Sequence, residues 1–174
     1  TLDNYIYTGY GFDYESNKSA IIYTSNDIQI ELVGTNTLTQ KDYLNTACIS
    51  GEANVSLTGA GILNLKRAAW GIISDYDISI EGGNLNVDAC TLGIYSANQE
   101  VIINGGNLKI DATKCAVNGY RGIVINGGSG IFRNTQDSVY HVLHAQYGSG
   151  PVTIDPSLVV TASTTADGEP GEYV

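Results

Sequence analysis

Acidic and amide side chains recur at two positions of this sequence that lie two residues apart. They precede the first four of five short apolar segments, which begin at residues 28, 55, 78, 101 and 123, so the sets align with one another. One set is Asp27, Asn54, Asp77 and Glu100, and the other is Ser25, Glu52, Asp75 and Asn98. Carboxylates stacked at the ~4.8 Å spacing of neighbouring strands repel one another unless a cation or water screens them.

These oxygen-bearing side chains suit a hard cation, because Ca²⁺ takes about six to eight oxygen ligands. The pattern predicts a calcium site with the ligands Glu52, Asn54, Asp75, Asp77, Asn98 and Glu100. The alternative is a solvated polar turn in which the Asp and Asn side chains bond their own backbone. Asp88 and Asp111 form a second candidate calcium site of the same kind. Only two repeats contribute to it, because Lys66 occupies the equivalent position one repeat earlier.

Aromatic side chains on and around the strand before this corner are candidates for sugar binding. The apolar faces of such rings meet sugar C–H groups, while polar side chains around them fix the orientation of the ligand. The predicted carbohydrate-binding residues are Trp70, Tyr95, Tyr76, Tyr23 and Tyr120. The alternatives are rings that lie on the surface or under the loop that contains Tyr43, and a contact strip for a neighbouring domain.

Residues that could support catalysis or a zinc site are few. The chain has eight Lys and Arg residues, and neither a Ser/His/Asp arrangement nor a phosphate-binding loop is present. His141 and His144 are close in sequence, but if Val142 points inward, His141 and Leu143 point outward and the two rings need not converge. The three Cys residues form no CxxC pair, which argues against zinc; we expect buried thiols, with a Cys90–Cys115 disulfide as the alternative. We predict no catalytic residue.

Composition excludes several classes of protein. The 174 residues carry a formal net charge of −10 and include 21 Gly but only 3 Pro. A basic face for nucleic acid is therefore not expected. No apolar run is long enough to span a membrane. Charged residues make up 15%, too few for a helical bundle, and 43% hydrophobic residues suit a folded domain. The lack of Met leads us to expect a domain cut from a longer chain.

An internal repeat predicts the fold. Each apolar segment alternates with the period of a strand, and three are followed by Gly pairs, which suit sharp corners. A second and a third short strand follow in each repeat, always in the same order. Parallel stacking of successive repeats fits this pattern better than hairpins do, with a β-sandwich as the alternative. The sequence therefore predicts an all-β, single-stranded right-handed parallel β-helix, a solenoid of five to six coils of about 23 residues.

The predicted core consists of four inward ladders of Ile, Leu and Val. They are Ile28/Val55/Ile78/Val101/Ile123, Ile30/Leu57/Ile80/Ile103/Ile125, Leu63/Leu85/Leu108/Ile131 and Ile22/Ile49/Ile72/Ile94/Val117. On the third strand Tyr23, Ile73 and Tyr95 are expected to face outward. We expect the β-helix domain to span residues 1–160, with irregular ends at 1–20 and 134–160, and a C-terminal linker or boundary at 161–174.

The opening coil and the repeat resemble a known family. The residues that carry this likeness are 19–23, 27–32 and 34–38, and the recurring patterns Gly-Ile-x-Ser and Ile-x-Ile-x-Gly-Gly-Asn-Leu-x-Val continue it over residues 1–150. They resemble a bacterial secreted β-helix family of calcium-dependent, polygalacturonate-binding modules, shaped like pectate lyases but without shown catalysis. Similar repeats also resemble those of wall-associated proteins of Gram-positive bacteria. The motif assigns no calcium ligand in this chain.

Together these observations predict an extracellular or cell-wall-attached, non-catalytic carbohydrate-binding module. The expected ligand is an acidic or pectin-like polysaccharide, bound with the help of Ca²⁺, and the expected partners include adjacent domains of a larger surface protein. Neither nucleic acid nor membrane insertion is expected. The alternative is a structural spacer or adhesin module of a surface protein, and a polysaccharide lyase is a third hypothesis.

Overall fold

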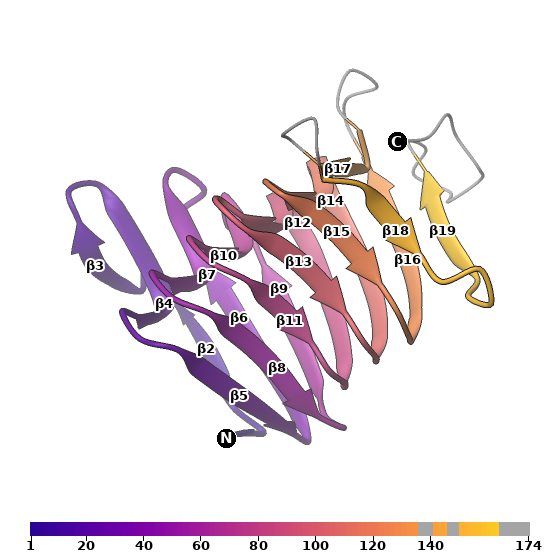
Figure 1. The fold of residues 1–174 in the computed structure, drawn as a ribbon. Helices are drawn as coiled ribbons and strands as arrows, with labels where there is room; N and C mark the ends of the chain where they lie inside the picture. Colours follow the sequence, from indigo (N-terminus) through magenta and orange to yellow (C-terminus); the bar gives the residue numbers. More distant parts are fainter. Residues whose placement is uncertain (136–140, 146–149, 164–174) are drawn as a thin grey trace.

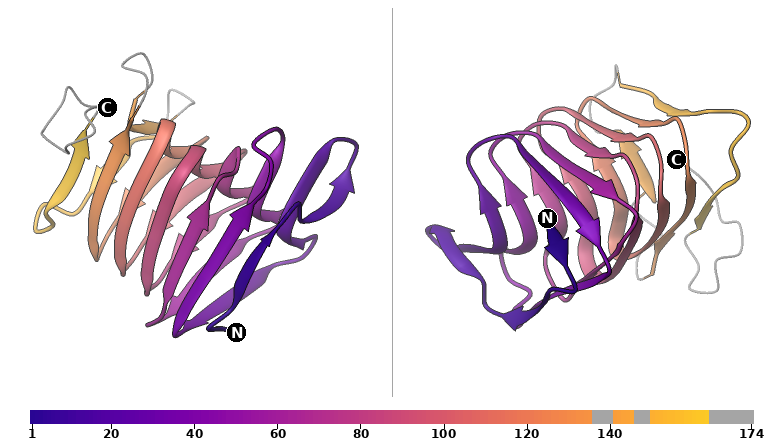
Figure 2. Two further views of the ribbon diagram at one scale, coloured as in Figure 1. Left: turned by 180° about the vertical axis from the view of Figure 1, so that it is seen from behind. Right: turned by 90° about the horizontal axis from the view of Figure 1, so that it is seen from below.

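The computed structural model describes residues 1–135, 141–145 and 150–163, and these residues contain strands but no helix. The chain winds as a right-handed β-solenoid of about five turns, as the repeat predicted (Figure 1). Strands β1 and β2 lie at one end of the solenoid and β18 and β19 at the other, as the further views show (Figure 2). No helix of the described part is long and apolar enough to cross a membrane.

The first face of the solenoid is a seven-stranded parallel sheet. Its strands, in order, are β1 (Leu2–Asp3), β5 (Ile28–Val33), β8 (Val55–Gly59), β11 (Ile78–Ile80), β13 (Glu100–Ile103), β15 (Gly122–Ile125) and β18 (Val152–Ile154). Each strand pairs in register with its equivalent one coil earlier. Strand β18 is the last of this face.

A second sheet bends around the other two faces. The second face contains β2 (Ile6–Gly9), β6 (Thr35–Gln40), β9 (Ile62–Lys66), β16 (Ser129–Asn134) and β19 (Val160–Ser163). The third contains β4 (Lys18–Thr24), β7 (Thr46–Gly51), β10 (Trp70–Ser74) and β17 (Leu143–Ala145). Two long strands, β12 (Asn84–Ser96) and β14 (Asn107–Gly119), run across both faces. Backbone pairing therefore continues around this corner in the middle coils.

The register confirms three of the four predicted inward ladders and corrects the fourth. Gly130, not Ile131, pairs with Leu108, and Phe132 pairs with Ile110. Phe132 is buried in the core, whereas Ile131 points outward and is 44% exposed. The reason is steric: a Cβ on Gly130 would lie within 2.3 Å of the Phe132 ring, so a Gly here leaves space for the larger side chain.

The Gly pairs form the predicted corners between the first and second faces. The second Gly of each pair, at positions 83, 106 and 128, has a φ between +83° and +88°. This left-handed conformation favours Gly because it has no Cβ. A Cβ on Gly106 would also lie 2.6 Å from the carbonyl oxygen of Gly83, so the corners stack too closely for a side chain.

The ends of the chain differ from the middle coils. Strands β1 and β2 form a partial first coil, and β3 (Phe12–Glu15) pairs antiparallel with β4. Strand β6 continues to Gln40, so the loop that contains Tyr43 begins after this residue. Residues 161–163, which the sequence assigned to the linker, belong to β19; residues 164–174 lie outside the described part.

The inward and outward registers can be tested on one strand. Ile103 of β13 is buried in the core, and its neighbour Ile102 faces outward and is half-buried. We expect Ile103→Ala to lower the free energy of unfolding by about 2–5 kcal/mol, because it removes core contacts and leaves a cavity. We expect Ile102→Ala to lower it by less than about 1 kcal/mol. Urea unfolding measures both, and equal losses would contradict the register.

Candidate functional site

The corner before the first face carries the first acidic ladder as a chain of hydrogen bonds between coils. Each of its first three side chains accepts a bond from the backbone N–H of the next rung. Asp27 Oδ1 accepts from Asn54 at 3.0 Å, Asn54 Oδ1 from Asp77 at 3.1 Å, and Asp77 Oδ1 from Glu100 at 3.0 Å. The predicted adjacency is correct. The side chains bond the backbone of the next coil, whereas the polar-turn alternative placed these bonds within their own turn.

The second ladder, two residues earlier, lies on the solvent side of the same corner. Glu52, Asp75 and Asn98 are exposed, and Glu52 accepts a hydrogen bond of 2.8 Å from the hydroxyl of Tyr23. This bond raises the pKa of the Tyr23 hydroxyl. Within the described residues no group of three His, Cys, Asp or Glu side chains is arranged to hold a metal ion. A cation here would need amide or backbone oxygens as well, so calcium stays a prediction.

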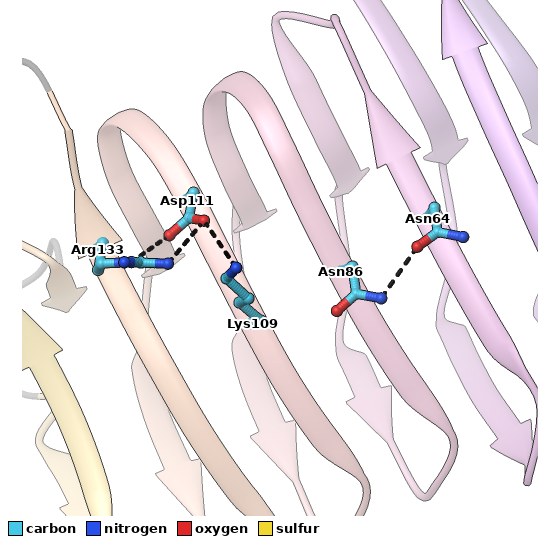
Figure 3. A network of polar contacts seen from close by, with 5 residues as sticks. All are labelled: Asn64, Asn86, Lys109, Asp111 and Arg133. Carbon is cyan, nitrogen blue, oxygen red and sulfur yellow. Dashed lines mark hydrogen bonds and ion pairs between the residues drawn. The ribbon is translucent and has the colours of Figure 1, made fainter. Parts of the chain in front are cut away.

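The Asp88–Asp111 pair on the second face is partly neutralised by basic neighbours. Asp111 receives two hydrogen bonds from the Arg133 guanidinium, one of them 3.0 Å from Nη2 to Oδ2, and Lys109 lies 3.9 Å away (Figure 3). On the same face, Asn86 Nδ2 donates to Asn64 Oδ1 at 2.9 Å (Figure 3). Bidentate Arg–carboxylate pairing satisfies Asp111 without a cation. Asp111 is therefore better explained as an ion-pair partner than as a calcium ligand.

Strand pairing places one outward row along the third face. In coil order its members are Tyr23, Ser50, Ile73, Tyr95, Asn118 and His144. This confirms the outward direction predicted for the first, third and fourth of them. Tyr23, at the N-terminal end of the row, stacks on Tyr14 with ring centroids 4.5 Å apart and planes at 15°. The ring of Tyr23, in β4, therefore packs against the antiparallel strand β3 and helps to hold this hairpin together.

The structure brings two of the five predicted aromatic residues, Trp70 and Tyr95, into one groove of about 430 Å³ on the third face. Trp70 belongs to a second row, paired with Leu92 and then with Cys115, that runs beside the row containing Tyr95. Tyr76, Tyr120 and Tyr23 do not line the groove. Leu92, Lys114, Asn118, His141 and His144 also line it, and the sequence did not predict them as binding residues.

The two histidines lie together in this groove, a contact that the sequence analysis did not predict. Their ring centroids are 5.6 Å apart. The expectation assumed strict alternation around Val142, but Val142 and Leu143 are both buried. The carbonyl of Val142 accepts hydrogen bonds from two successive N–H groups, those of Ala116 and Val117, so the regular pairing is broken here.

The electrostatics of the groove differ from those of the whole chain. Although the chain is strongly acidic, no Asp or Glu is among the described residues that line the groove. Its basic side chains are Lys114 and the two histidines. Burial, and the neighbouring His141, lower the pKa of His144, which favours the neutral imidazole. Burial also raises the pKa of Tyr95, with smaller contributions from Asp75 and Tyr120. The groove is thus apolar, aromatic and free of carboxylates in the part of the chain that is described.

All three cysteines are buried free thiols, so the alternative of a Cys90–Cys115 disulfide is wrong. In the register Cys115 pairs with Leu92, and Cys90 pairs with Ala112. The Cys115 thiol donates to the carbonyl of Val117 at 3.2 Å. Burial raises its pKa to about 12, so this thiol beside the groove stays protonated and is a poor nucleophile.

The protein is a parallel β-solenoid, and stacking of its coils aligns equivalent outward residues in rows along the face that carries the aromatic groove. A carbohydrate-binding domain family matches residues 11–166, which is most of the chain, and the chain belongs to this family. Membership indicates a carbohydrate-binding module in general. No curated protein and no solved structure matches the chain significantly.

The hydrogen-bonded ladder at the corner gives a prediction about stability in calcium-free buffer. Asp77→Ala removes the acceptor for the Glu100 N–H, and we expect the free energy of unfolding to fall by about 1 kcal/mol. Asp77→Asn keeps an acceptor oxygen, so we expect less than half of that loss. Urea unfolding with a chelator present measures both variants. Equal losses would show that the negative charge, not the hydrogen bond, stabilises the corner.

Proposed function

We propose that the protein is a non-catalytic carbohydrate-binding module whose groove on the third face binds a glycan chain. The observation that carries the proposal is that Trp70 and Tyr95, from adjacent coils, line one groove with polar side chains beside them. Aromatic faces provide apolar contact area for sugar rings, while amide and imidazole groups supply directional hydrogen bonds. Family membership supports the same function.

An acidic glycan is the proposed ligand class. Lys114, His141 and His144 line the groove, and the absence of Asp and Glu from its described lining removes the main source of repulsion. Electrostatic attraction of this kind acts mainly on specificity and on the rate of association. The proposal also includes an extracellular or cell-wall location with adjacent domains, which rests on the family resemblance of the repeat.

Calcium is proposed as a separate contribution at the acidic corner. Asp75 and Glu52 are exposed, and the carboxylate of Asp77 offers a second oxygen besides the one that accepts the Glu100 N–H. A cation bound here would reduce the repulsion between neighbouring coils and the repulsion of an anionic chain. Tyr95 links the acidic corner to the groove. It lines the groove, and Asp75 of the corner lies close enough to raise the pKa of its hydroxyl.

A rigid spacer or adhesin module is the second candidate function. It is favoured by side-chain ladders that tie neighbouring coils together, such as Asn107 to Asn84 at 3.0 Å and Asn126 to Asn104 at 3.0 Å. These bonds stiffen the solenoid and contribute nothing to a glycan site. A polysaccharide lyase is the third hypothesis; it predicts unsaturated products when the protein is incubated with pectate.

The groove is tested by a glycan array of acidic and neutral oligosaccharides, followed by calorimetry with the tightest ligand. We expect Trp70→Ala and Tyr95→Ala each to weaken binding about tenfold or more, because each removes a central aromatic contact. Tyr76→Ala is the matched control: Tyr76 is 51% exposed and lies outside the groove, so its loss should leave affinity unchanged. Silence of the wild-type protein across the array would favour the spacer.

The calcium proposal is tested by melting temperature during a calcium titration. At a hundredfold excess over the dissociation constant, we expect a rise of about 5 °C or more, because ligand that binds only the folded state stabilises it. The double variant Asp75→Asn plus Asp77→Asn keeps the backbone acceptor at Asp77 and should lose the rise while melting normally without calcium. A wild-type protein that shows no calcium-dependent shift contradicts the proposal.

A further inference from the structure

The side chain of Asn118 has a buried acceptor without a partner. It is 9% exposed, and Oδ1 is one of two buried side-chain polar atoms in the described residues that lack a hydrogen bond. Native proteins pair nearly all such atoms, and an unpaired one destabilises the fold. Asn118 lies in the outward row between Tyr95 and His144, and it lines the groove. The unpaired oxygen therefore lies at the candidate site.

The opposite end of the same amide has a neighbour. Asn118 Nδ2 lies 3.5 Å from Nδ1 of His144, and the lowered pKa of His144 favours the neutral ring that can accept from it. With the amide nitrogen directed at the imidazole, Oδ1 is left for another donor. A hydroxyl or an amide N–H would satisfy it, whereas a carboxylate would place one acceptor against another.

We propose that Asn118 is the specificity-determining residue of the groove, and that Oδ1 accepts a hydrogen bond from a hydroxyl or acetamido N–H of the bound sugar. This inference rests on the proposed function and adds an orientation to it. The donor-bearing edge of one sugar lies at Asn118, and any carboxylate of the glycan lies away from this residue. A site built to pair a ligand donor strongly rejects the analogue that lacks it, because its buried acceptor is then left unpaired.

The variant Asn118→Leu separates this role from a structural one. Leu has nearly the shape of Asn but no polar atoms, so the variant removes the unpaired Oδ1 together with the long 3.5 Å contact to His144. Because these two effects on stability oppose each other, we expect the variant to melt close to the wild-type temperature in the absence of glycan. We expect its affinity for the tightest oligosaccharide of the array to fall at least tenfold. The substitution should therefore lower affinity without lowering stability. If Asn118 only supported the fold, the substitution would lower both.

Asn86→Leu is the matched control. Asn86 lies on the second face outside the groove, and its amide donates to Asn64 at 2.9 Å. The same substitution there breaks an existing hydrogen bond, so we expect a lower melting temperature and unchanged glycan affinity. Asn86→Leu should therefore lower the melting temperature alone, and Asn118→Leu should lower the glycan affinity alone.

A series of deoxy and deacetylated analogues of the same oligosaccharide completes the test and needs no variant. One analogue should lose at least tenfold in affinity for the wild-type protein and bind Asn118→Leu no worse than the parent sugar does. If the wild type binds glycans and Trp70→Ala abolishes binding, but no analogue loses affinity or Asn118→Leu binds normally, this inference fails and the proposed function stands. If the wild type binds no glycan, both are overturned.

Discussion

In-register stacking of parallel coils is the constraint on which the structure depends. Each strand of the first face pairs with its equivalent one coil earlier, so a residue type repeated in the sequence becomes a ladder in space. The inward ladders have to be apolar because the core is narrow and dry. The corners have to accept close stacking of backbone, which Gly106 and its equivalents permit. The same register determines which outward side chains lie next to one another.

The candidate site is a local departure from that regularity. In the middle coils the third face presents Trp70 and Tyr95 in adjacent rows, and His144 continues the row of Tyr95. His141 lies beside His144, next to the irregular pairing at Val142. The groove is consequently aromatic and without carboxylates in its described lining, on a chain whose net charge is −10. A repeating scaffold thus provides rigidity, and the break in the repeat provides a hollow with its own chemistry.

Predictions from the sequence were correct where they followed from the repeat, and they were wrong where the repeat becomes irregular. The solenoid and three of the four core ladders followed from periodicity alone. Ile131 was assigned inward because it continued an apolar pattern, but pairing of Gly130 with Leu108 shifts the ring of Phe132 into the core. The contact between the histidines was missed because alternation does not hold at Val142. The ladder from Asp27 to Glu100 was placed correctly, but a sequence cannot show that backbone N–H groups already use its oxygens.

The central claim is that a glycan occupies the groove on the third face, and the chain contains a reporter for it. Trp70 is the only Trp in the sequence, and it lines this groove. Tryptophan emission measured during titration with the oligosaccharide that binds most tightly therefore reports on the groove alone. The account predicts a saturable change in emission with the same dissociation constant as calorimetry gives. Binding seen by calorimetry while the emission of Trp70 stays constant would contradict it.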